Sequence, residues 1–174
     1  MTAAEDAYRQ ALRINPNLRE ALYGLGTILK GQGKMSQAKD YLQRVKSEEQ
    51  QIIKANQAAA LNADGISFMN RGQIDQALRA FQAALANDPT FALAAYNAGV
   101  VLARMGRNQD AVKAFRVAIQ LKPGLAAAHF GLGLVLRQMG DPTAAAELDE
   151  AQLLNKFVPN PSGGGDQTSL ESTY

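Results

Sequence analysis

The chain has 174 residues, of which 47% are apolar and 20% are charged, and its formal net charge is +2. Cysteine is absent and there is one histidine, which excludes disulfides and thiolate metal sites and leaves too few imidazole ligands for zinc. Lysine and arginine are scattered, and no apolar run approaches the roughly 20 residues of a membrane-spanning helix. We therefore expect no nucleic-acid binding and no membrane insertion.

A spacing of 34 residues recurs along the chain. It separates Gly72 from Gly106, Gly106 from Gly140, and Phe81 from Phe115. A fixed period of this length is typical of stacked helical hairpins, in which one hairpin cannot bury its apolar face alone. We therefore predict an all-α fold, an α-solenoid of antiparallel helix pairs, without strands.

The predicted elements begin with a single amphipathic helix that ends before Pro16, followed by four helical hairpins. The hairpins cover residues 19–45, 58–89, 92–123 and 126–151. Glycine stands just past the first helix of each hairpin, where a left-handed cap residue is favoured. These glycines are Gly33, Gly72, Gly106 and Gly140. Because the chain begins with only the second half of a repeat, we expect it to be part of a longer protein.

The residue types within each period resemble those of the tetratricopeptide repeat family. Residues 92–123 show the pattern of apolar, small and aromatic residues and a closing proline with Ala95, Ala98, Gly99, Leu102, Ala111, Phe115, Ala118 and Pro123. The resemblance covers roughly residues 3–155 and recurs four times. It implies a right-handed superhelix that binds other proteins on its concave face, without catalysis and without a cofactor.

One spacing departs from the period, since Gly33 and Gly72 are 39 residues apart. Five extra residues therefore lie between Val45 and Ala58, and no glycine or proline occurs from 35 to 64. Two structures fit this pattern: one helix from about 35 to 70, or a tight break near 50–55 that restores regular stacking. A long helix would free the N-terminal segment to pack on a second copy, as in a domain swap.

Asp64 supports a change in stacking at this point, because it occupies a position that the family normally fills with leucine. We divide the chain into a half repeat with the first full repeat (1–50), an inserted helical linker (51–57) and three further repeats (58–156). Residues 157–174 form a tail rich in proline, glycine and serine, which we expect to be disordered.

The resemblance also indicates which side chains face the concave surface, because the first helix of each repeat lines it in this family. Mapped onto this chain, the predicted contact residues are Tyr23, Thr27, Lys30, Asn62, Ile66, Met69, Asn70, Tyr96, Asn97, Val100, Arg104, Phe130, Leu134 and Arg137, with Gln138 beside them. Aromatic residues recur at one position of three repeats, and a base follows in each. This pattern predicts an amphipathic trough for a protein or peptide partner.

Some family members hold a peptide C-terminal carboxylate with a clamp of basic and asparagine side chains. Asn97 matches one clamp asparagine. The preceding first helix has Asn62 and Ile66 where lysine and asparagine are required, and the next has Ala127 and Gly131 where two bases are required. The clamp is therefore not carried over, and we do not expect binding of chaperone C-terminal tails.

We predict a protein-interaction scaffold that is not an enzyme. His129 falls on a packing position, and no nucleophile stands at a spacing that would suggest catalysis. Two alternatives remain: a self-associating structural module that pairs through residues 46–57, and an accessory domain of a larger enzyme or complex. The sequence does not indicate a compartment.

Overall fold

The computed structural model describes residues 2–157. Within them it contains eight α-helices and no strand, which confirms the prediction of an all-α fold. The described chain divides into two compact units, residues 2–57 and 58–157, and each is considered by itself. In this described part, no helix has both the length and the apolar character needed to cross a bilayer. The predicted tail lies outside the described residues, except for residue 157 at the end of the last helix.

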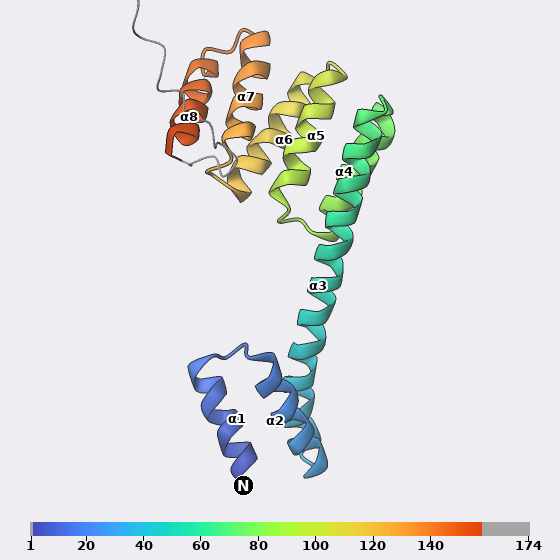
Figure 1. Cartoon of the computed structure of the whole chain (residues 1–174), viewed down its shortest axis with the longest axis vertical. Coiled ribbons are helices and arrows are strands. Elements are labelled where there is room, and N and C mark those ends of the chain that lie inside the picture. Colours follow the sequence, from blue (N-terminus) through green and yellow to red (C-terminus); the bar gives the residue numbers. More distant parts are fainter. Residues whose placement is uncertain (1, 158–174) are drawn as a thin grey trace, which may run out of the picture. The chain divides into compact units, whose positions relative to one another are not determined.

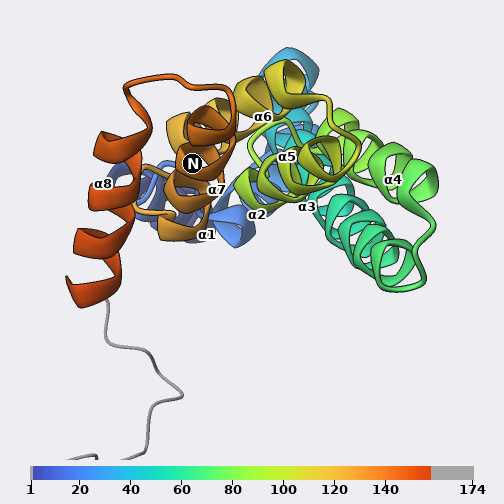
Figure 2. The same ribbon diagram turned by 90° about the horizontal axis from the view of Figure 1, so that it is seen from above.

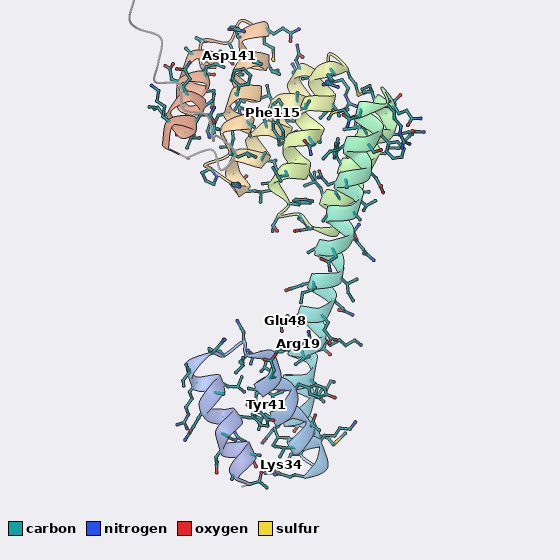
Figure 3. All side chains as sticks on the ribbon, viewed as in Figure 1. Arg19, Lys34, Tyr41, Glu48, Phe115 and Asp141 are labelled. Carbon is teal, nitrogen blue, oxygen red and sulfur yellow. The ribbon has the colours of Figure 1, made fainter. Side chains whose placement is uncertain are left out.

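The first unit contains α1 (Ala3–Ile14), α2 (Arg19–Gly31) and the beginning of α3 (Met35–Asn70) (Figure 1). Its centre is formed by leucines of α2, Leu25 and Leu29, which are fully buried. Tyrosines from the flanking helices pack around them, and one of these, Tyr41 of α3, is labelled in Figure 3. The predicted half repeat is thus one helix that completes the core of the first full repeat.

A buried carboxylate connects the N-terminal helix of this unit to the end of α2. Glu5 is fully buried. Gln32 Nε2 donates a hydrogen bond of 3.0 Å to Glu5 Oε2, and Arg9 Nη2 donates one of 2.9 Å to Oε1. These two donors, Gln32 first and Arg9 second, hold the pKa of Glu5 below its ordinary value because they favour the charged form.

The helix α3 runs unbroken from Met35 to Asn70. The alternative of a tight break near 50–55 is therefore wrong. Residues 46–57 are mostly good helix formers without proline or glycine, so nothing in the local sequence ends the helix. Gly65 lies within the helix, and its lack of a side chain lets the Phe81 ring pack directly against the backbone. Asp64 is exposed, in agreement with the interpretation that stacking changes here.

The second unit consists of the end of α3 and five further helices, arranged as successive antiparallel neighbours (Figures 1 and 2). The helices are α4 (Ile74–Asn87), α5 (Ala92–Arg104), α6 (Asn108–Leu121), α7 (Ala126–Gln138) and α8 (Ala144–Phe157). Phe81 of α4 and Phe115 of α6 are fully buried in the shared core. Phe115 is labelled in Figure 3. Each of these rings fills the space between neighbouring hairpins.

The turns agree with the prediction made from glycine and proline. The glycine after each first helix has a φ between 72° and 75°, a left-handed conformation that is strained for any residue with a Cβ. The second helices that precede a proline end two residues before it, as α4 does at Asn87 before Pro89. Local sequence therefore places the boundaries of the hairpins.

We predict that Phe115→Ala lowers the free energy of unfolding by about 3–5 kcal/mol, because it leaves a cavity in the core of the second unit. Cβ atoms built on Gly99 and Gly131 would lie 2.8 and 2.7 Å from the Phe115 ring, so two helices meet at this side chain. Urea unfolding of the full chain measures the change. Val117→Ala, at a side chain that is 43% exposed on the same helix, is the control. Equal effects of the two substitutions would contradict the role given to Phe115.

We predict that Glu5→Gln destabilises the first unit at neutral pH but not at acidic pH. A carboxylate whose pKa is lowered by folding adds stability above its unfolded-state pKa, and this contribution is lost as pH falls through the lowered value. The difference between wild type and variant should therefore shrink as pH falls below the ordinary value of 4.5. Chemical unfolding at several pH values measures it. Asp6→Asn, at an exposed neighbouring carboxylate, is the control, and parallel pH profiles for wild type and Glu5→Gln would refute the prediction.

Candidate functional site

The second unit has a pocket of about 370 Å³ between its successive first helices, α5 and α7. It is lined by Tyr96, Val100, Ala103, Arg104, Phe115, Ala127, Phe130, Gly131, Leu134, Val135 and Gln138. All but one of these residues come from α5 and α7. The exception, Phe115, belongs to α6 and reaches the pocket from behind.

Helical spacing brings these side chains to one surface. On α5, Tyr96, Val100 and Arg104 succeed each other at intervals of four residues, so they lie along one face. On α7, Phe130 and Leu134 have the same spacing. The two faces meet across the pocket because α5 and α7 are first helices of consecutive repeats.

The floor of the pocket depends on a glycine. A Cβ at Gly131 would lie 2.7 Å from the Phe115 ring, so only glycine lets this ring approach so closely. The Tyr96 ring packs against the Phe115 ring, with 5.9 Å between the ring centroids and an interplanar angle of 46°. Such tilted aromatic contacts are favourable and hold both rings in place. The floor is therefore apolar and rigid.

The edge of the pocket carries exposed apolar surface and one base. Phe130 is 52% exposed and Leu134 36% exposed, which is unusual for large apolar side chains that stand side by side. Arg104 is exposed, and among residues 2–157 no carboxylate lies within ion-pair distance of it. An apolar floor beside an unpaired guanidinium can take an apolar side chain and orient a neighbouring acidic or polar group.

Five of the predicted contact residues therefore meet around one pocket. These are Tyr96, Val100, Arg104, Phe130 and Leu134, and Gln138 joins them. Arg137 is exposed on α7 but does not line the pocket. Met69 is partly buried against the core of the unit, whereas Ile66 is 38% exposed on α3 and Asn70 ends that helix.

Two predicted asparagines bind each other instead of lining the pocket. Asn97 Nδ2 donates a hydrogen bond of 2.9 Å to Oδ1 of Asn62, which is 8% exposed. The bond joins α3 to α5 and satisfies a buried polar group that would otherwise cost stability. It leaves Asn97 with one amide proton and its own carbonyl oxygen for other partners.

The remaining predicted contact residues belong to the first unit. Tyr23 is 59% exposed and lines a pocket of about 660 Å³ in that unit. Lys30 lines a second pocket there, of about 460 Å³. Thr27 Oγ1 donates a hydrogen bond of 2.9 Å to the backbone oxygen of Tyr23, so its hydroxyl proton is already engaged.

Sequence reasoning missed several residues that line the pocket of the second unit, namely Ala103, Phe115, Ala127, Gly131 and Val135. In the sequence, Phe115 and Gly131 stand at positions that indicate packing alone. Their shared role could have been inferred from the family register, because a large residue of one second helix faces a small residue of the next first helix.

Two titratable side chains of the second unit, His129 and Asp141, have structural partners. His129 Nδ1 lies 2.8 Å from Glu147 Oε2, and its Nε2 lies 2.9 Å from the backbone oxygen of Pro123. The side chain joins α7 to α8, as expected for a packing position. Asp141 accepts hydrogen bonds from the backbone N–H and the hydroxyl of Thr143, which lower the pKa of the carboxyl group. Within residues 2–157, no group of three or more potential metal ligands comes together.

Comparisons with known proteins agree with this architecture. Two sequence models described as tetratricopeptide repeat match residues 62–126 and 20–49. A crystal structure of MamA is 25% identical with a TM-score of 0.56, covering 87% of this chain and 86% of that chain. The second repeat domain of Spaghetti (RPAP3), bound to an HSP90 peptide, is 23% identical with a TM-score of 0.59, covering 61% of this chain and 98% of that chain.

YrrB, described as a repeat protein with an unusual peptide-binding site, is 21% identical with a TM-score of 0.54, covering 88% of this chain and 77% of that chain. The likeness to Spaghetti and YrrB concerns the fold alone. No curated protein matches the sequence. The sequence-model matches, the 34-residue period and the stacked helical hairpins together show that the chain belongs to the tetratricopeptide repeat family.

Proposed function

We propose that this protein is a protein-interaction scaffold whose second unit binds a segment of a partner in the pocket between α5 and α7. The observation that carries the proposal is the pocket itself, where Tyr96, Phe130 and Leu134 present apolar surface around a rigid floor. Structural neighbours of this fold include one solved with a bound peptide, which supports a peptide as the class of ligand.

Apolar burial would supply most of the affinity. Covering exposed apolar surface contributes about 25 cal/mol per Å², before the costs of association are subtracted. Phe130 and Leu134 are the side chains that gain most, because each still exposes a third or more of its surface. Since the Phe115 ring is already held by packing, the floor of the pocket loses little freedom when a ligand binds.

The edge of the pocket would select the ligand. Arg104 offers five N–H donors to an acidic or amide group beside the apolar anchor. Ala127 and Gly131 stand where a carboxylate clamp would need bases, so a free C-terminus has no special advantage here. We therefore infer that the ligand is an internal segment with a large apolar side chain and an acidic residue nearby.

We predict that Tyr96→Ala combined with Phe130→Ala weakens binding by more than about tenfold, because truncated aromatic anchors typically cost about 2 kcal/mol or more. Peptides selected from a random display library on the full chain provide the ligands, and fluorescence anisotropy measures their dissociation constants. Leu93→Ala combined with Val117→Ala removes similar exposed apolar surface away from the pocket and is the control. The proposal fails if both double variants bind the peptides as tightly as wild type does.

We predict that Arg104→Glu selectively weakens binding of peptides that carry an acidic residue beside the apolar anchor. The effect should diminish at high salt, because a solvent-exposed charge pair is screened. The same anisotropy assay at low and high ionic strength measures it. Arg79→Glu makes the same charge change at an exposed position on α4 and should have little effect. An equal loss for neutral and acidic peptides would show that Arg104 does not select the ligand.

A further inference from the structure

At two junctions between consecutive repeats, a large residue of one helix packs on a glycine of the next first helix. In the first unit Tyr8 packs on Gly24, and in the second unit Phe115 packs on Gly131. The two members of each pair are 16 residues apart in sequence. Because the two helices run antiparallel, this pairing sets the register of the whole junction.

A second pair lies three residues from the first on each helix. Ala118 and Ala128 are fully buried in one cluster, and Ala84 and Ala94 are fully buried in another. In both cases the two alanines are 10 residues apart in sequence. The junction between α6 and α7 has both contacts, and the other two junctions each have one of them.

The junction expected after the first full repeat has the same residue types. The five extra residues lengthen the 16-residue spacing of the first pair to 21 and the 10-residue spacing of the second pair to 15. The counterparts of the two pairs are therefore Leu42 with Ala63 and Val45 with Ala60. All four residues belong to α3, and a helix cannot pack against itself. Consistent with an unpartnered face, Ala60 is exposed, whereas its counterparts Ala94 and Ala128 are fully buried. Ala63 is also exposed, whereas its counterpart Gly131 is half-buried against the Phe115 ring.

The other half of this junction is an open apolar groove in the first unit, which we call the Leu42 groove. It consists of the two pockets of that unit, of about 660 and 460 Å³, which share Leu42 and Lys46. Leu42 is the counterpart of Phe115, which is 1% exposed in the second unit because α7 covers it. The residues that line the groove are Arg19, Glu20, Tyr23, Lys30, Met35, Ser36, Ala38, Lys39, Leu42, Gln43, Val45, Lys46 and Glu49.

Charge complements shape at this junction. Within the second unit, Val112 and Leu132 are buried in one cluster, as are Leu78 and Ala98. At the equivalent positions stand Lys39, on the edge of the Leu42 groove, and Asp64, exposed on α3. Two side chains of opposite charge thus replace an apolar pair. Each charged side chain can be hydrated when its surface is free, and the two attract each other when the surfaces meet.

We propose that two copies of this chain pair through antiparallel α3 helices, so that residues 60–64 of each copy occupy the Leu42 groove of the other. The occupant is a second copy because the groove requires small residues and an acid in the register that residues 60–64 supply. The contact is reciprocal, so the pair closes with twofold symmetry and does not extend into a filament.

The register of this pairing makes an independent prediction about the middle of α3. If Leu42 lies beside Ala63 of the second copy, the twofold axis passes between Ile52 and Ile53, because the midpoint of residues 42 and 63 falls between them. The same register places Val45 beside Ala60 of the second copy. Ile52 and Ile53 are 47% and 55% exposed, and they are the large aliphatic side chains of the segment 46–57.

Helical phase agrees with this arrangement. Leu42 and Ala63 each lie ten and a half residues from the midpoint of α3. Supercoiled helices have roughly 3.5 residues per turn, so this distance is three full turns. Leu42, Ala63 and the midpoint between Ile52 and Ile53 therefore lie on the same side of α3. The pairing uses none of the side chains that line the pocket between α5 and α7. Its tests are therefore independent of the tests of the proposed function.

The first test is the mass of the full chain in solution, measured by sedimentation equilibrium over a range of concentrations. We expect a dimer, twice the 18.6 kDa of one chain. Ile52→Asp combined with Ile53→Asp should yield monomers, because both side chains are exposed in one copy and meet at the axis of the pair. Val117→Asp changes an equally exposed side chain and should stay dimeric. A wild-type monomer at every concentration, or a dimer that survives the double aspartate variant, overturns the proposal.

The second test uses the absence of natural cysteine. The variant Leu42→Cys with Ala63→Cys should form a disulfide-linked dimer on mild oxidation. A disulfide within one chain would mean that α3 breaks and the junction forms internally, and no disulfide would mean that another molecule fills the groove. Either result overturns the proposal. Leu42→Cys with Gln82→Cys, at an exposed position of α4, is the control that should not cross-link.

Discussion

The close approach between a second helix and the first helix of the next repeat supports the rest of this structure. It requires a large side chain on one helix and nearly none on the other, as with Phe115 and Gly131. Burial of these rings provides the apolar stabilisation that one hairpin cannot obtain alone. The same contact sets the register in which neighbouring hairpins stack, so the periodic sequence and the periodic structure have one cause.

The proposed binding surface is a direct consequence of this packing. Phe115 belongs to the core on one side and forms the floor of the pocket on the other. A floor that is part of the core does not reorganise when a ligand arrives, which lowers the entropic cost of binding. At the edge, Arg104 and the exposed Phe130 and Leu134 would set the chemistry of the recognition that we propose. Apolar contacts and a single base suit the binding of a partner segment.

The long helix α3 is the consequence of an interruption in the regular spacing. Five extra residues convert the turn between two repeats into helix, and the residues that would have met across that turn now stand on one element. Their polarity differs from that of the second unit, since Lys39 and Asp64 stand where its junctions have apolar residues. The small residues of this junction are retained, and its two charged side chains have opposite sign. Both features are consistent with a junction that forms between two copies of the chain.

Sequence alone determined the all-α fold, the ends of the hairpins and five residues of the pocket, because periodicity, glycine caps and prolines act locally. Two features needed the tertiary structure. Residues 46–57 favour helix by propensity, but a short break that restores stacking also fitted the sequence, and only the structure shows that α3 continues. Phe115 also looked like an ordinary core residue, because a linear sequence does not show which side of a buried ring remains open to a groove.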